Sequence, residues 1–240
     1  MSALAARTGA LNLGQGFPDA DGPDEIADAV TVAMRSGHAN QYAPLAGVTQ
    51  LRAEIADHQR RLYGLKVDVD DGIQVTFGAT EAIAATMLGL LEPGDAVVVL
   101  EPFYDSYAAT IALAGGARRL VTMRPPDFAI DLEALAVAAR GARMLLLNSP
   151  HNPTGRVLSR AELEAIATVC IEHDLIAVCD EVYEHLVFDG EHIPLATLPG
   201  MAERTLTISS AGKSFSFTGW KIGWCSGPPE LVAGVRAAKQ

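Results

Sequence analysis

Short apolar runs recur along most of the chain and alternate with longer segments of helical periodicity. Runs that are apolar on both faces are typical of strands buried in a parallel sheet. The expected strands span residues 73–77, 96–100, 118–121, 144–147, 175–179, 205–208 and 222–225. Their alternation with helical segments predicts an α/β fold, a three-layer sandwich in which helices cover both faces of a mostly parallel central sheet.

The helical segments lie between these strands, before the first of them and after the last. In the segment 48–63, Leu51, Ile55 and Leu62 fall on one face, as in an amphipathic helix. Proline and glycine mark the junctions between segments. The expected helices span residues 23–36, 48–63, 80–91, 105–114, 132–139, 160–173 and 230–240.

Composition and charge exclude several classes of function. The 240 residues are 49% hydrophobic, enough for a substantial core, and the net charge is −11 without a block of basic residues. No nucleic-acid or membrane partner is therefore predicted. No signal peptide pattern is found, and three widely spaced cysteines argue against a disulfide framework, so a cytoplasmic protein is expected. The six histidines include no His-Glu-x-x-His pattern, and we predict no metal.

Lys213 lies in a small, hydroxyl-rich loop after the expected strand 205–208. An amine partly dried there by Phe215, Phe217 and Trp220 would have its ammonium form disfavoured and could form a Schiff base with a carbonyl. That is the chemistry of a pyridoxal phosphate enzyme. A lysine among serine and glycine is more often simply solvated, so this prediction depends on other segments.

Polar side chains also follow two other expected strands. The run 175–179 delivers Asp180 and Tyr183 to its carboxyl end, where open α/β sheets bind ligands. The run 144–147 leads into a turn that contains Asn152 and is fixed by two prolines and a glycine. Taken alone, Asp180 is compatible with a helix cap, Tyr183 with core packing and Asn152 with turn geometry.

Asn152, Asp180, Tyr183 and Lys213, in this order and with these neighbours, resemble the class I/II aminotransferases of the fold-type I pyridoxal phosphate superfamily. The resemblance runs from about Leu11 to the end of the chain. LGQGFPD at 13–19 and GWKIGW at 219–224 resemble the branch that contains kynurenine, glutamine and methionine aminotransferases. EPFYDSY at 101–107 and DEVYEHL at 180–186 are similar to N-succinyldiaminopimelate aminotransferases of that branch.

The resemblance implies a catalytic role for three of these residues. Lys213 would hold pyridoxal 5′-phosphate and move a proton between the substrate α-carbon and the cofactor. Asp180 would pair with the pyridine nitrogen, so that the ring accepts electrons. Tyr183 and Asn152 would hydrogen-bond the phenolic oxygen of the ring, and Asn152 would also contact the substrate.

The remaining cofactor contacts are implied in the same way. Phosphate is expected at Gly78, Ala79 and Thr80, where a strand gives way to a helix, although the glycine and threonine also suit ordinary capping. Ser210 and Lys221 would complete the phosphate site. Many relatives carry arginine in place of Lys221, and lysine lacks the bidentate fork of arginine.

Three further positions complete the implied site. Tyr104 would stack on the cofactor ring, although an aromatic residue at such a junction is more often core. Gly16 would lie near the substrate carboxylate. Tyr42 resembles the tyrosine that reaches the phosphate of the other subunit, which implies a homodimer.

The resemblance also implies a domain division. Residues 1–36 would be an N-terminal segment of a small domain and residues 37–240 the pyridoxal phosphate-binding large domain, with the C-terminal small domain absent. The arginine that binds the substrate carboxylate in the family lies in that domain, and no residue here matches it.

The implied reaction is ping-pong transfer of an amino group between an L-amino acid and a 2-oxo acid. The implied substrate is N-succinyldiaminopimelate or one of methionine or kynurenine type. Two alternatives stay open from the sequence. One is a cysteine-conjugate β-lyase with the same cofactor, and the other is a truncated, non-catalytic cofactor-binding protein.

Overall fold

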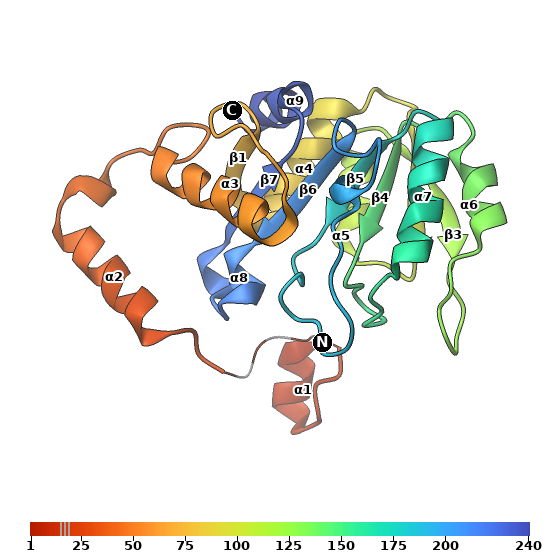
Figure 1. Ribbon diagram of the computed structural model, residues 1–240. Helices are drawn as coiled ribbons and strands as arrows, with labels where there is room; N and C mark the ends of the chain where they lie inside the picture. The colour runs from red at the N-terminus through yellow and green to blue at the C-terminus, as the bar shows by residue number, and fades with distance from the viewer. Residues whose placement is uncertain (15, 17, 19) are drawn as a thin grey trace.

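Seven strands form one sheet in the computed structural model, which describes residues 1–14, 16, 18 and 20–240. Their order across the sheet is β1-β7-β6-β5-β4-β2-β3 (Figure 1). The strands are β1 (Ile73–Phe77), β2 (Ala96–Glu101), β3 (Ala117–Thr122), β4 (Met144–Asn148), β5 (Ile176–Asp180), β6 (Thr205–Ser210) and β7 (Ile222–Ser226). β7 runs antiparallel to both neighbours and the other pairs are parallel, so the predicted mostly parallel sheet is confirmed.

Helices cover both faces of this sheet, as the sequence predicts. The helices are α1 (Ser2–Thr8), α2 (Asp24–Arg35), α3 (Thr49–Tyr63), α4 (Gly78–Leu90), α5 (Ser106–Leu113), α6 (Leu132–Ala139), α7 (Arg160–Glu172), α8 (Ala211–Ser214) and α9 (Pro229–Lys239). One face packs against α3, α6 and α7, and the other against α4, α5 and α9 (Figure 1). The predicted three-layer sandwich is therefore confirmed.

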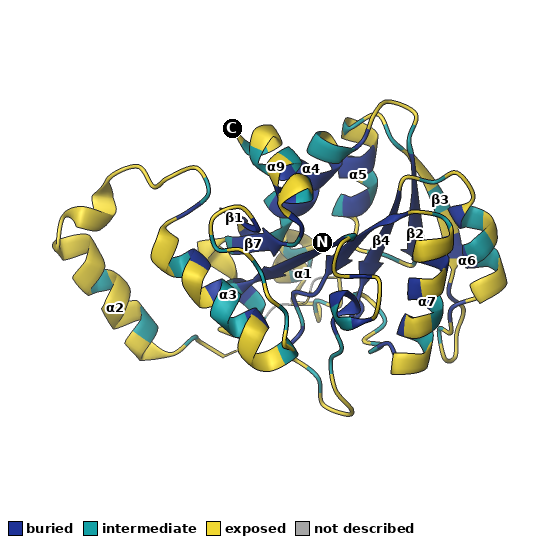
Figure 2. Ribbon diagram, turned by 45° about the horizontal axis from the view of Figure 1, so that its top comes forward, coloured by how far each residue is buried: buried dark blue, intermediate teal, exposed yellow. Residues whose placement is uncertain are grey.

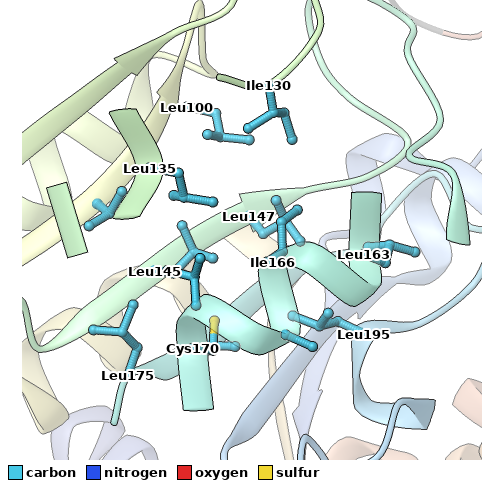
Figure 3. Packing of buried hydrophobic residues seen from close by; sticks show 14 of the residues in the cluster. Leu100, Ile130, Leu135, Leu145, Leu147, Leu163, Ile166, Cys170, Leu175 and Leu195 are labelled. Atoms are coloured by element: carbon cyan, nitrogen blue, oxygen red, sulfur yellow. The ribbon is translucent and has the colours of Figure 1, made fainter. Parts of the chain in front are cut away.

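Side chains of the central strands alternate between two apolar cores. In β4, Leu145 and Leu147 join the core under α6 and α7, whereas Met144 and Leu146 join the core under α4 and α5. Figure 3 shows the first core, where Ile166 of α7 lies beside the β4 side chains. Each fully buried side chain of this size stabilises the fold by about 1.5–3 kcal/mol. Burial on both faces explains why the strands read as continuous apolar runs.

The predicted elements agree with the observed ones to within two residues at each end. Two helices were not predicted. α1 lies in the alanine-rich start of the chain, and α8 lies in the segment expected to be a loop around Lys213. Part of the LGQGFPD motif, at positions 15, 17 and 19, lies outside the described residues.

α1 and α2 differ from the other α-helices of the described residues, because neither contains a buried residue. α2 stands apart from the sheet in Figure 1 and is mostly exposed along its length in Figure 2. Along the described part of the chain, every helix is too short or too polar to cross a membrane.

Candidate active site

A cavity of about 650 Å³ opens where β4, β5 and β6 end. These strands are parallel neighbours, so their carboxyl ends lie along one edge of the sheet. Every predicted site residue except Tyr42 lines this cavity. These residues are Gly16, Gly78, Ala79, Thr80, Tyr104, Asn152, Asp180, Tyr183, Ser210, Lys213 and Lys221.

Tyr42 lies outside the cavity, in the segment between the 3-10 helix His38–Asn40 and α3. Its side chain is fully exposed. Its contribution to the site of a second subunit stays a prediction.

Asp180 is a buried carboxylate at the end of β5. The hydroxyl of Tyr107, on α5, donates to Asp180 Oδ2 at 2.6 Å, and the Val182 N–H donates to Oδ1 at 3.4 Å. Burial raises the pKa of Asp180 to about 6, although both hydrogen bonds oppose that shift. Among the described residues, no basic side chain forms an ion pair with Asp180. Its carboxylate is therefore matched to a cation from a ligand in the cavity.

Lys213 lies in α8, directly after β6, and therefore at the same edge of the sheet as Asp180. Its Nζ atom is 5.5 Å from the centre of the Tyr183 ring. Partial burial lowers the pKa of Lys213, and the nearby charge of Lys221 lowers it further. Both effects favour the neutral amine, which is the nucleophilic form.

The placement of the three aromatic residues expected to dry Lys213 does not support that prediction. Phe215 is 47% exposed, Trp220 is 41% exposed, and Phe217 stacks on Trp220 at 4.1 Å between ring centres. None of the three lines the cavity. α8 ends at Ser214, and the left-handed backbone of Ser216, with φ of 59°, turns the chain between Phe215 and the other two rings.

Tyr183 and Asn152 both line the cavity. Burial raises the pKa of Tyr183 and the charge of Asp180 adds to the shift, whereas a hydrogen bond with the Asn152 side chain opposes it. Asn148 positions this group. Its Oδ1 atom accepts from the Asn152 N–H and its Nδ2 atom donates to the Asp180 carbonyl, both at 2.7 Å.

The start of α4 forms a cationic end of the cavity. The first N–H groups of a helix lack intrahelical partners and favour an anion. Gly78 has φ of 74°, and a Cβ atom there would meet Lys221 Cε at 3.2 Å. A Cβ atom at Gly223 would collide with the Gly78 carbonyl carbon at 2.3 Å. The two glycines therefore let the Lys221 side chain approach the helix N-terminus.

Tyr107 and Asn148 were missed as site residues by the sequence analysis. Both line the cavity and bond directly to Asp180. Tyr107 stands in the EPFYDSY segment, three residues after Tyr104, and its ring meets that of Tyr104 edge on at 5.8 Å. A buried tyrosine hydroxyl requires a hydrogen-bond partner, and this requirement was the one signal that could have pointed to Tyr107. The partner is 73 residues away in sequence, so it could not be identified.

The residues of this cavity fit the pyridoxal phosphate predicted from the sequence. The donors at the start of α4, with Lys221 and Ser210, suit a phosphate. The buried carboxylate of Asp180 suits a protonated ring nitrogen, and Lys213 supplies an amine of lowered pKa. An anion site, a carboxylate and an amine thus converge in one cavity.

Residues 8–240 match the family model described as aminotransferase class I and II. The chain is 56% identical over 245 residues to a probable N-succinyldiaminopimelate aminotransferase DapC of Mycobacterium tuberculosis, covering 100% of this chain and 61% of that protein. It is 42% identical to the methionine aminotransferase of Escherichia coli, covering 100% of this chain and 62% of the relative.

The fold agrees with a solved structure. The structure of the N-succinyldiaminopimelate aminotransferase from Mycobacterium tuberculosis superposes with a TM-score of 0.97 at 56% identity, covering 100% of this chain and 63% of that one. The chain thus spans less than two thirds of the length of the relatives that it matches.

Proposed function

We propose that this chain, which belongs to the class I and II aminotransferase family, acts in transfer of an amino group between an L-amino acid and a 2-oxo acid. Pyridoxal 5′-phosphate is the cofactor of this family. The observation that carries the proposal is the convergence of Lys213, Asp180 and the anion site at the start of α4 in one cavity.

The proposed chemistry divides between the cofactor and the protein. Pyridoxal phosphate, when bound, supplies an aldehyde and an electron-accepting ring. Lys213 would hold the cofactor through its Nζ atom and, when released from it by the substrate amine, would remove the proton from the substrate α-carbon. The lowered pKa of Lys213 supports both roles. Asp180 would pair with the ring nitrogen and keep it protonated, and the Tyr107 hydroxyl orients the Asp180 carboxylate.

The remaining side chains hold the cofactor and the substrate. Gly78, Ala79 and Thr80 would present the N-terminal N–H groups of α4 to the phosphate, and Ser210 and Lys221 would also contact it. Tyr183 and Asn152 would hydrogen-bond the phenolic oxygen of the cofactor ring, and Tyr104 would stack on that ring. Gly16 would lie near the substrate carboxylate, and Asn152 would also contact the substrate.

The substrate, the assembly and the compartment belong to the same proposal. The relative at 56% identity supports N-succinyldiaminopimelate as amino donor, within amino-acid biosynthesis. The fully exposed Tyr42 supports a homodimer in which this tyrosine reaches the phosphate of the other subunit. Three buried, unpaired cysteines support a reducing compartment such as the cytoplasm.

The division into domains is also part of the proposal. Residues 37–240 would form the cofactor-binding large domain, and residues 1–36 would belong to a small domain. The absence of buried residues in α1 and α2 supports this division, because these helices contribute nothing to the core of the sheet.

Reductive trapping tests the assignment of Lys213. The chain is mixed with pyridoxal phosphate, its absorbance spectrum is recorded, and borohydride then fixes the cofactor for peptide mapping by mass spectrometry. We expect a new absorbance band and a cofactor adduct on Lys213 in the parent chain. Both should be lost in Lys213→Ala and retained in Lys66→Ala, a change at an exposed lysine.

Amino-group transfer is measured on samples mixed with pyridoxal phosphate but not treated with borohydride, as 2-oxo acid released from N-succinyldiaminopimelate, methionine or kynurenine. An adduct that forms equally well in Lys213→Ala would overturn the role of Lys213. Pyruvate and ammonia released from a cysteine conjugate, without amino-group transfer, would favour the β-lyase.

A further inference from the structure

A second cluster of titratable side chains lies on the α3 side of the sheet. His58 comes from α3, and Glu184 and His185 come from the segment that follows β5. The two histidine Nε2 atoms are 2.9 Å apart, and Glu184 Oε2 lies 3.8 Å from that of His58 and 4.0 Å from that of His185. None of the three residues lines the cofactor cavity.

Glu184 is held in place by two hydroxyl groups. Tyr63 donates to its Oε2 atom at 2.7 Å, and Ser209 donates to its Oε1 atom at 2.5 Å. The Glu184 side chain is 2% exposed, and among the described residues no lysine or arginine forms an ion pair with it. A buried carboxylate without a cation is costly, so this arrangement favours a positively charged ligand.

The two imidazoles satisfy the other requirements of a metal site. Two nitrogens bound to one zinc ion at about 2.0–2.1 Å lie roughly 2.9–3.4 Å apart for ligand angles of about 90–110°. The observed separation falls within that range. The His58 and His185 side chains are 21% and 37% exposed, so water can reach the ion.

We propose that His58, Glu184 and His185 bind a divalent transition-metal ion, with zinc as the best match and water as the fourth ligand. Tyr63 and Ser209 would orient the carboxylate from the outer shell. The absence of a His-Glu-x-x-His motif led the sequence analysis to predict no metal. His58 precedes His185 by 127 residues, so no local motif could show this cluster.

The ion would connect α3 to the segment that carries the candidate cofactor residues. Glu184 directly follows Tyr183 and lies four residues after Asp180. Binding at this site would therefore stabilise the position of that segment against the helix layer. The proposal does not depend on the proposed aminotransferase activity, because none of its three ligands lines the cofactor cavity.

Zinc titration of the chain tests the proposal, in protein without pyridoxal phosphate or a polyhistidine tag. Calorimetry should give one zinc ion per chain, and cobalt should produce the visible absorbance of a site with low coordination number. His58→Gln and His185→Gln should each weaken zinc binding by at least about 100-fold, and Tyr63→Phe by about 10-fold. His38→Gln, at an exposed histidine on the 3-10 helix, is the matched control and should bind zinc as the parent does.

Two outcomes would overturn the proposal. One is a parent chain that binds no stoichiometric zinc, in which case the two imidazoles share only a hydrogen bond. The other is zinc binding that is equal in the parent, His58→Gln and His185→Gln. Circular dichroism of each variant checks folding, and the exposed position of His185 keeps the test available if His58→Gln does not fold.

Discussion

Asp180 and Glu184 are two buried carboxylates on one short segment, and their surroundings differ. Each accepts a hydrogen bond from a tyrosine hydroxyl, Asp180 from Tyr107 of α5 and Glu184 from Tyr63 of α3. These helices lie on opposite faces of the sheet (Figure 1). Asp180 faces a large cavity that also contains an amine, whereas Glu184 has a second hydroxyl donor and two imidazoles close by.

The different surroundings of Asp180 and Glu184 indicate which features identify the candidate cofactor site. Burial of a carboxylate is common to both clusters and so does not distinguish them. What distinguishes Asp180 is an open cavity that also holds Lys213 and the anion site at the start of α4. Three chemical requirements of one ligand are met there at once, and this coincidence is more specific than any single residue.

Removing the charge of Asp180 should have the largest effect. Asp180→Asn keeps the shape of the side chain but loses the charge expected to pair with the ring nitrogen. We expect the affinity for pyridoxal phosphate to fall by about 4 kcal/mol, or ~1,000-fold in Kd, as for one partner of a buried charge pair. Absorbance titration measures it. Asp189→Asn, at an exposed position on the same segment, is the control, and equal affinities for both variants would contradict the prediction.

The pH dependence of stability should show a smaller effect from the same residue. The pKa of Asp180 is about 6 in the folded chain and 3.8 as its ordinary value. Between these values the folded state binds more protons, so the free energy of unfolding falls as pH rises from about 4 to above 6. The expected loss is on the order of 3 kcal/mol.

Urea unfolding of the cofactor-free chain at pH 4 and pH 7 tests this expectation. The difference in stability between the parent and Asp180→Asn isolates the contribution of Asp180, because the other titrating groups are common to both proteins. A difference that stays constant across this pH range would refute the pKa assignment.

Much of the fold followed from local patterns in the sequence. The run 144–147 is a continuous apolar stretch of strand length, and the helix over 132–139 is rich in leucine and alanine, so both could be predicted without tertiary contacts. α8 could not. Its four residues, AGKS, include a glycine and are too few to show helical periodicity, and the helix forms directly after β6.

In the candidate site, too, the residues at strand ends could be predicted, whereas contacts between distant residues could not. Asp180 and Lys213 directly follow buried strands, and strand ends share one edge of a parallel sheet. The bond from Tyr107 to Asp180 joins residues 73 positions apart, so no local pattern carries it. The position of the Trp220 ring outside the cavity was not predictable for a similar reason. The chain reaches Trp220 through the left-handed residue Ser216, and no local sequence pattern shows that turn.

Removing each tyrosine hydroxyl should give the smallest effects and separate the two carboxylates. Tyr107→Phe leaves Asp180 with one long N–H contact, and we expect a loss of about 2 kcal/mol in the free energy of unfolding. Tyr63→Phe should cost about 1 kcal/mol, because Ser209 still donates to Glu184. Urea unfolding at neutral pH measures both.

Tyr104→Phe is the control for this pair, since no hydrogen bond of its hydroxyl is found among the described residues, and it should change stability by less than about 0.5 kcal/mol. A larger loss in Tyr63→Phe than in Tyr107→Phe would contradict the comparison.

Tyr107→Phe should also move the pH-dependent loss of stability to higher pH, because its hydroxyl lowers the pKa of Asp180. Tyr63 lies on the other face and donates to a different carboxylate, so a shift of that kind in Tyr63→Phe would mean that the two clusters are coupled.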